Sequence, residues 1–162
     1  MIQNPHSVVL SDLLSPKTIN LNLKSGDREA VLVELVDQIP QLADQPESRQ
    51  TLLRALRERE ELCSTGIGDG IAIPHCRNGL VGLVDDSIMV FGRHPTGIQF
   101  GSIDSLPTRL FFLLVAPTVT RHLAILARLT LLLRDPLLRQ TLLAADTPQK
   151  VISVIRAAES KS

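Results

Sequence analysis

Ser64-Thr65-Gly66-Ile67-Gly68-Asp69-Gly70-Ile71-Ala72-Ile73-Pro74-His75 is the stretch around which the rest of this 162-residue chain is arranged. Its alternating glycines exclude a helix, and the apolar run after them reads as a buried strand that Pro74 interrupts. Three glycines in alternation also allow successive backbone N–H groups to point into one concavity, which suits an oxyanion. The stretch therefore predicts a turning segment that leads into a short strand ending at His75.

On both sides of this stretch the apolar spacing predicts further helices and strands. Before it, we expect a strand at 19–23 and helices at 27–39 and 46–62; after it, strands at 87–93 and 108–116 and helices at 119–134, 136–145 and 148–158. Thr118, Asp135 and Thr147 stand where the last three helices need N-caps. Helices, then strands, then helices indicate an α/β domain built in layers.

Composition limits the function classes. Lysine plus arginine equals aspartate plus glutamate, 17 against 17, so no overall field attracts nucleic acid or an anionic membrane. The length and the 44% hydrophobic content predict one domain over 1–162, with a peripheral lead of about residues 1–16. The N-terminus lacks the pattern of a signal peptide, no apolar run is long enough to span a bilayer, and the two cysteines suggest no disulfide framework. We therefore expect a cytoplasmic protein without membrane insertion.

His75 is the candidate nucleophile. Pro74 stiffens the chain immediately before it, and a neutral imidazole is nucleophilic near pH 7. Beside glycine amides that hold phosphoryl oxygens, it would form the minimum apparatus for accepting a phosphoryl group. No Walker A or dinucleotide-binding pattern is present, so nucleotide binding is not predicted.

Two residues elsewhere strengthen this interpretation. His122 begins an inward-facing series on the helix predicted at 119–134 and lies in its first turn, where free N–H groups favour an anion. Arg59 continues the spacing of Leu52 and Leu56, which places its guanidinium on the buried side of its helix or at the rim. Each residue alone is more often structural, but together with His75 they provide what a transferring phosphate needs.

Two other interpretations of these residues remain open at this point. His75 could simply cap a strand end. Alternatively, His75, Cys76, His122 and Cys63 could bind zinc, although the chain lacks the paired spacing typical of such sites.

From Arg59 to His75 the sequence resembles the signature of enzyme IIA domains of the fructose/mannitol class (type 2). These domains belong to the bacterial phosphoenolpyruvate-dependent phosphotransferase system, and the class includes nitrogen-regulatory IIA proteins. The resemblance implies a three-layer α/β/α fold with a central mixed sheet. It also implies a phosphohistidine carrier in which His75 accepts phosphate from HPr or a paralogue and passes it to an enzyme IIB, with no metal or other cofactor.

The same resemblance assigns roles to other residues. His122 and Arg59 would stabilise the phosphoryl group, and the phosphate-binding residues would be Ser64, Thr65, Gly66, Gly68 and Gly70. Freestanding members can instead be regulators that bind target proteins according to their phosphorylation state. A more remote alternative is an interaction module with the same fold that is not phosphorylated.

The chain departs from the family pattern at three positions. Cys63 and Cys76 stand where glycine is expected, and Asp69 stands where asparagine is common. A carboxylate beside a bound phosphoryl group would repel it. Asp69 therefore predicts slower transfer or a less stable phosphoprotein, unless its side chain turns away.

Overall fold

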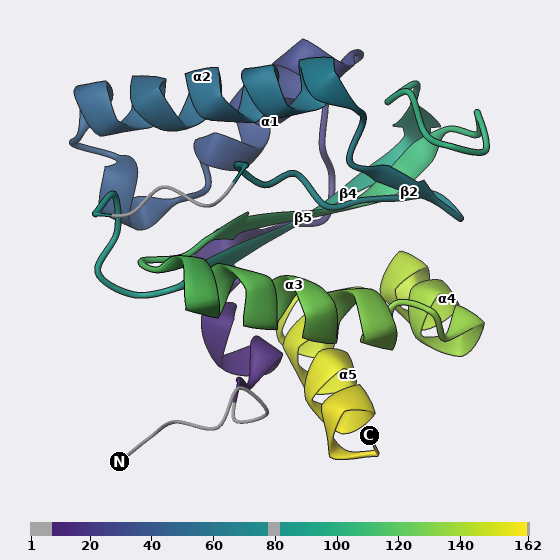
Figure 1. Ribbon diagram of the computed structural model, residues 1–162. Helices are drawn as coiled ribbons and strands as arrows, with labels where there is room; N and C mark the ends of the chain where they lie inside the picture. Colours follow the sequence, from purple (N-terminus) through teal and green to yellow (C-terminus); the bar gives the residue numbers. More distant parts are fainter. Residues whose placement is uncertain (1–7, 78–81, 162) are drawn as a thin grey trace.

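A computed structural model describes residues 8–77 and 82–161 and shows a mixed sheet between two layers of helices (Figure 1). The strands are β1 (Ile19–Asn20), β2 (Gly66–Gly68), β3 (Ile71–Ala72), β4 (Ile88–Ile98) and β5 (Thr108–Val115). Their order in the sheet is β1-β4-β5-β3-β2. β1 runs parallel to β4 and β3 parallel to β5, whereas β4 and β5, like β2 and β3, are antiparallel. The predicted three-layer α/β/α architecture with a mixed sheet is confirmed.

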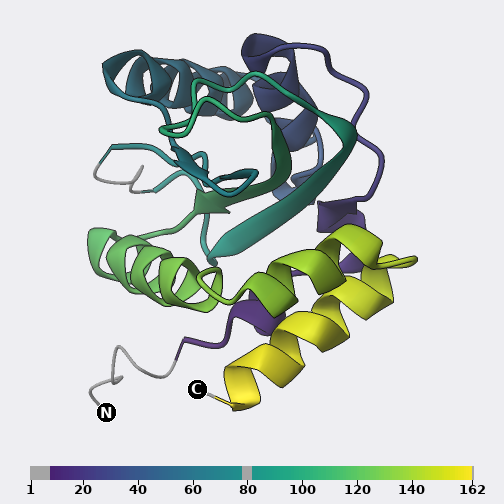
Figure 2. The ribbon, with the colours of Figure 1, turned by 90° about the vertical axis from the view of Figure 1, so that its right-hand side faces the viewer.

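The helices divide into two groups by position in the sequence. The first layer holds α1 (Arg28–Val36) and α2 (Pro46–Leu62), and the second holds α3 (Val119–Leu132), α4 (Pro136–Ala144) and α5 (Pro148–Ser160), as Figures 1 and 2 show. Three short 3₁₀ segments complete the described part: η2 (Leu10–Leu13), η3 (Pro16–Thr18) and η4 (Pro40–Leu42). Thr118, Asp135 and Thr147 cap their helices through the side chain, as predicted.

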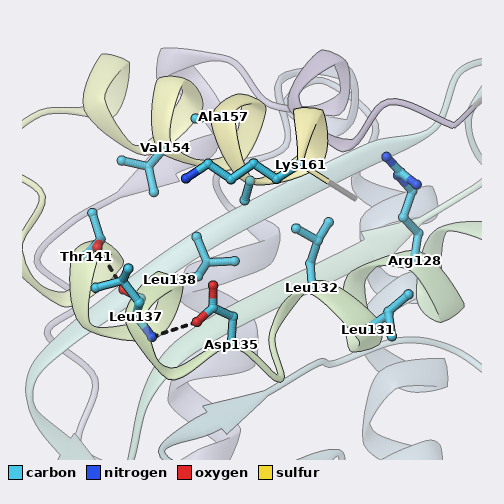
Figure 3. Close-up of a pocket in the computed structure, with 11 residues that line it drawn as sticks. Arg128, Leu131, Leu132, Asp135, Leu137, Leu138, Thr141, Val154, Ala157 and Lys161 are labelled. Carbon is cyan, nitrogen blue, oxygen red and sulfur yellow. Dashed lines mark hydrogen bonds between the residues drawn. The ribbon is translucent and has the colours of Figure 1, made fainter.

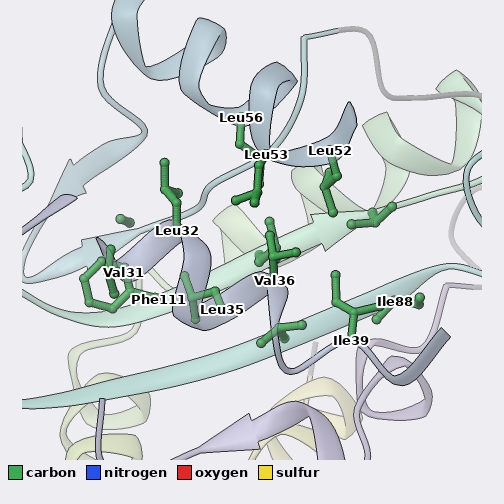
Figure 4. Packing of buried hydrophobic residues seen from close by; sticks show 14 of the residues in the cluster. Val31, Leu32, Leu35, Val36, Ile39, Leu52, Leu53, Leu56, Ile88 and Phe111 are labelled. Carbon is green, nitrogen blue, oxygen red and sulfur yellow. The ribbon is translucent and has the colours of Figure 1, made fainter. Parts of the chain in front are cut away.

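The two central strands are buried on both faces because a helical layer covers each side. Along β5, Phe111 and Leu113 enter the core under α1 and α2, whereas Leu110 and Phe112 enter the core under α3 to α5. This alternation is the two-residue period of a strand, seen here as a continuous apolar run because neither face meets water. Figure 4 shows the first core, where side chains of α1 and α2 pack onto the sheet.

The N-terminal lead is more than peripheral from residue 8 onward, which corrects the prediction for that part. Leu10 and Leu14 are buried in the second core, and the backbone N–H groups of Leu10 and Ser11 donate to the carboxylate of Glu159 on α5 at 2.7 and 2.9 Å. Apolar side chains in the lead therefore complete the core. Residues 1–7 of the predicted lead lie outside the described residues.

Two strands differ in length from the prediction. β1 is shorter than 19–23, although Leu23 N–H still donates to the carbonyl of Arg93 on β4 at 2.9 Å. β4 continues to Ile98, beyond its predicted end at residue 93, and its pairing with β5 shifts register between Arg93 and Ile98. Such an irregularity accommodates Pro95, which cannot donate to the ladder. In the parts of the chain that the structure describes, no helix is long and apolar enough to cross a membrane.

Candidate active site

His75 follows β3 in a segment that is bonded on both sides. Ile73 N–H donates to the Thr65 carbonyl at 3.0 Å, and the Pro74 carbonyl accepts from Leu114 N–H of β5 at 3.1 Å. The half-buried His75 ring places Nδ1 2.6 Å from the Ile73 carbonyl oxygen. A carbonyl can only accept, so Nδ1 carries the proton and the lone pair lies on Nε2. The backbone thus selects the tautomer whose Nε2 is nucleophilic.

His122 faces His75 from the first turn of α3. The two ring centroids are 5.4 Å apart, with the planes tilted by 47°. The His122 side chain is 3% exposed, and its Nδ1 is enclosed without a hydrogen-bond partner within the described residues. Enclosed polar atoms are normally paired, so this enclosed nitrogen is an exception to the usual pattern. The predicted meeting of the two histidines is confirmed.

Both rings favour their neutral forms. Burial lowers the pKa of His75 and the positive charge of Arg59 lowers it further, while the bond to the Ile73 carbonyl acts in the opposite direction. The pKa of His122 is also lowered, first by burial and then by the charge of His75. Near neutral pH the lone pair on His75 is therefore available for attack.

Arg59 lies in the last turn of α2, half-exposed at the rim. Its guanidinium donates to the carbonyl of Cys63, just beyond the helix end. Together with burial, the positive charge of Arg59 lowers the pKa of His75. Of the two predicted placements, the rim is the one observed, and there the cation can meet the charge of an incoming group.

The glycine-rich stretch forms a hairpin rather than a single concavity. Gly68, Asp69 and Gly70 make its closed end, with φ angles of +92°, +56° and +76°. Gly70 precedes His75 by five residues, about 16 Å of extended chain. Asp69 is exposed there, and its backbone N–H donates to Asp104 at 2.9 Å. The carboxylate that the sequence placed beside the phosphoryl group thus lies at the far end of the hairpin.

The open end of the hairpin lies next to His75, because Thr65 is hydrogen-bonded to Ile73, two residues before His75. Its two hydroxyls are already engaged: Ser64 Oγ donates to the Phe100 carbonyl at 2.7 Å, and Thr65 Oγ1 donates to Glu60 at 2.6 Å. Gly66 N–H donates to Ser64 Oγ at 3.0 Å, and a Cβ at Gly66 would lie 2.4 Å from Ser102 Oγ. This end is therefore a tightly built support for the nucleophile.

Glu60 is a site residue that the sequence analysis missed. It is 3% exposed, and its carboxylate accepts from both the N–H and the hydroxyl of Thr65. Burial raises the pKa of Glu60, and the two bonds to Thr65 oppose that rise. The spacing from Leu53 to Leu56 to Glu60 was the available signal, since it places a carboxylate on the buried stripe of α2.

The cysteines do not support the zinc alternative. Cys63 is exposed and Cys76 is buried, and burial raises the pKa of the Cys76 thiol to about 12. Across residues 8–77 and 82–161, no group of three or more histidine, cysteine, aspartate or glutamate side chains is arranged to hold a metal ion.

A separate hollow of about 410 Å³ lies between α3, α4 and α5 (Figure 3). Leucines such as Leu132 and Leu138 form its floor, and Arg128 and Lys161 stand at its edge. It contains neither His75 nor His122, so the histidine pair and this hollow are distinct features.

Solved structures of known proteins share this fold. Nitrogen regulatory protein IIA-Ntr from Neisseria meningitidis aligns with a TM-score of 0.80 and 25% identity, covering 91% of this chain and 99% of that one. The mannitol IIA of Escherichia coli aligns with a TM-score of 0.73 and 24% identity over 88% of this chain and 98% of that chain. The fold of this chain is therefore that of IIA proteins.

The chain belongs to the family described as phosphoenolpyruvate-dependent sugar phosphotransferase system, EIIA 2, whose family model matches residues 12–158. The fructose-specific EIIABC component of Bacillus subtilis is 36% identical over 90% of this chain, which spans only 23% of that protein. A nitrogen regulatory protein of Bradyrhizobium diazoefficiens is 34% identical over 90% of this chain and 94% of its own length. The predicted family is confirmed, and its members include both sugar-transport and regulatory proteins.

Proposed function

We propose that His75 accepts a phosphoryl group on Nε2 from the phosphohistidine of HPr or an HPr-like carrier. The observation that carries this proposal is the bond from His75 Nδ1 to the Ile73 carbonyl, which leaves the lone pair on Nε2. His122 is the weaker acceptor candidate because its side chain is almost fully buried. His75, by contrast, is half-exposed and within reach of a partner protein.

The transfer exchanges one nitrogen–phosphorus bond for another. The lone pair on His75 Nε2 forms the new bond while the donor's bond breaks, and its electron pair leaves with the donor ring. The proton on His75 Nδ1 stays in its bond to Ile73, whose carbonyl dipole stabilises the positive charge that the ring gains. Because the bonds broken and formed are alike, catalysis consists mainly of alignment and charge neutralisation.

The surrounding residues divide this work. Arg59 and His122 offer a cation and a ring N–H to the phosphoryl oxygens, while Ser64, Thr65 and Gly66 hold the segment behind the nucleophile. Gly68 and Gly70 shape the turn at the far end. We therefore assign phosphoryl stabilisation to Arg59 and His122, and support to the open end of the hairpin.

The onward acceptor is an enzyme IIB in our first hypothesis. A solved complex of the E. coli mannitol IIA with its phosphorylated IIB has the same fold on the IIA side, with a TM-score of 0.74. The second hypothesis is a regulator that signals through its phosphorylation state. Relatives named nitrogen regulatory protein support it, since this chain covers 94% of two of them, but it also covers 94% of a fructose-specific EIIA component.

A reconstituted phosphorelay tests the proposal. Incubation with phosphoenolpyruvate, enzyme I and HPr is expected to give an acid-labile, base-stable phosphoprotein, and folded His75→Ala is expected to remain unlabelled. Full labelling of His75→Ala would contradict the proposal. Chasing the labelled protein with candidate IIB proteins then separates the two hypotheses, since rapid loss of label to a IIB identifies a carrier and retention identifies a regulator.

A further inference from the structure

We propose that Glu60 is a positioning residue, which fixes through Thr65 and Ile73 the carbonyl that selects the tautomer of His75. This inference rests on the proposed function of His75. Glu60 does not touch the incoming phosphoryl group; it acts on the backbone that orients the nucleophile.

A continuous path of hydrogen bonds joins Glu60 to His75. The Glu60 carboxylate accepts from Thr65 N–H at 2.9 Å and from Thr65 Oγ1 at 2.6 Å. The carbonyl of Thr65 accepts from Ile73 N–H at 3.0 Å. The carbonyl of Ile73 in turn accepts from His75 Nδ1 at 2.6 Å. The carboxylate and the imidazole are thus connected through two residues, Thr65 and Ile73.

Glu60 holds the hairpin flank of this arrangement at Thr65, beside the bonds that Ser64 and Gly66 make with the β4–β5 connection. On the opposite side, Leu114 N–H holds the Pro74 carbonyl, so the central sheet anchors that end of the segment. On the hairpin side, Thr65 is held by a side chain from α2 through both its N–H and its hydroxyl. Loss of the carboxylate frees Thr65, and the Ile73 peptide can then tilt its carbonyl away from Nδ1.

The burial of Glu60 favours a functional role over simple packing. A carboxylate in an apolar stripe costs free energy unless hydrogen bonds compensate, and burial raises the pKa of Glu60 accordingly. An apolar side chain would fill the same stripe without that cost. What an apolar side chain cannot do is accept the two hydrogen bonds that hold Thr65.

The test combines a spectroscopic readout with kinetics. Nitrogen-15 spectra of the unphosphorylated wild type are expected to show His75 with Nδ1 protonated. In Glu60→Gln one amide group replaces two acceptor oxygens, so we expect a mixture of tautomers. We also expect an about tenfold lower maximal rate of phosphoryl transfer from HPr, with an unchanged KM for HPr, because partner binding is not altered.

Matched variants keep the test decisive. Glu61→Gln changes the exposed neighbour and is expected to behave as wild type. Thr65→Val removes one bond to Glu60 and is expected to lower the rate and to mix the tautomers, whereas Thr65→Ser retains the hydroxyl and is expected to be faster than Thr65→Val. If Glu60→Gln does not fold, the comparison of Thr65→Ser with Thr65→Val tests the proposal instead.

The outcomes separate this inference from the proposed function. If the wild type itself is not phosphorylated on His75, the proposed function fails. If the wild type is phosphorylated but folded Glu60→Gln and Thr65→Val keep both the wild-type tautomer and the wild-type rate, the role of Glu60 is overturned. A lower rate with an unchanged tautomer would also overturn it, because the effect would then bypass His75.

Discussion

The two ends of the β2–β3 hairpin use one glycine-rich motif for different purposes. The closed end consists of Gly68, Asp69 and Gly70, all with positive φ, and is held to the β4–β5 connection through Asp104. The open end consists of Thr65 and the segment that pairs with it, and it leads directly to His75. One end sets the backbone conformation, and the other supports the histidine to which we assign phosphoryl transfer.

This difference predicts that the motif tolerates change unevenly. Asp-Gly is a favoured pair where two consecutive residues need positive φ, so Asp69 suits its turn. At the open end, by contrast, hydrogen bonds from α2, the β4–β5 connection and β5 meet at a few peptide groups. Variants at the closed end should therefore change mainly the free energy of unfolding, and variants at the open end should change mainly the rate of phosphoryl transfer.

Arg59→Gln is expected to give the largest effect of the four variants compared here, a loss of roughly 10³-fold in the rate of transfer to His75. The charge of Arg59 also lowers the pKa of His75, so the variant should raise that pKa. Since the neutral ring is the nucleophile, the acid limb of the pH–rate profile should move to higher pH. An NMR titration of His75 measures the shift directly, and a pKa that falls in the variant would contradict the account.

His122→Ala should slow transfer by roughly 10²-fold, the effect of removing one group that stabilises developing charge. Removal of a buried ring also leaves a cavity, so the free energy of unfolding must be measured in parallel. His122→Asn restores a polar group of similar reach and should recover part of the rate. Equal transfer rates for His122→Ala and wild type would remove His122 from the mechanism.

Gly68→Ala tests the closed end. The residue has φ +92°, and a Cβ there would lie 3.2 Å from Asp104 Oδ2. We expect a loss of about 1–2 kcal/mol in the free energy of unfolding, measured by urea denaturation. Transfer to His75 should stay within about threefold of wild type, and a loss of transfer comparable to that of Arg59→Gln would show that the two ends are not separable.

Asp69→Asn is expected to have the smallest effect. The side chain is exposed at the far end of the hairpin, and Asn also tolerates positive φ, so the free energy of unfolding should change by less than about 0.5 kcal/mol. The lifetime of the phosphoprotein should also be unchanged. A clearly longer lifetime in Asp69→Asn would place the carboxylate nearer the phosphoryl group than the structure does.

Much of the fold was predictable because apolar periodicity reports burial directly. The helices after the sheet and their caps at Thr118, Asp135 and Thr147 follow from spacing and capping chemistry. The extension of β4 to Ile98 was not predictable, because pairing across a register shift depends on β5 and not on local sequence.

The closeness of the two histidine rings was predictable, but the hydrogen bonds that support them were not. Spacing and family resemblance placed Arg59, His75 and His122 in one site, and the structure brings the two rings to 5.4 Å. The role of Glu60 and the different roles of the two hairpin ends were not predicted. Both depend on hydrogen bonds between segments whose contact cannot be read from the sequence. Alternating glycines are compatible both with an anion-binding site and with a turn. Only the observed φ angles distinguish the two.

The central claim is that the backbone prepares His75 Nε2 to carry the phosphoryl group. Phosphorus–nitrogen coupling in nitrogen-15-labelled protein, phosphorylated through enzyme I and HPr, measures the site of attachment directly. The account predicts one phosphoryl group, bonded to Nε2 of His75, with Nδ1 still protonated. Attachment to Nδ1 of His75, or to His122, would contradict it.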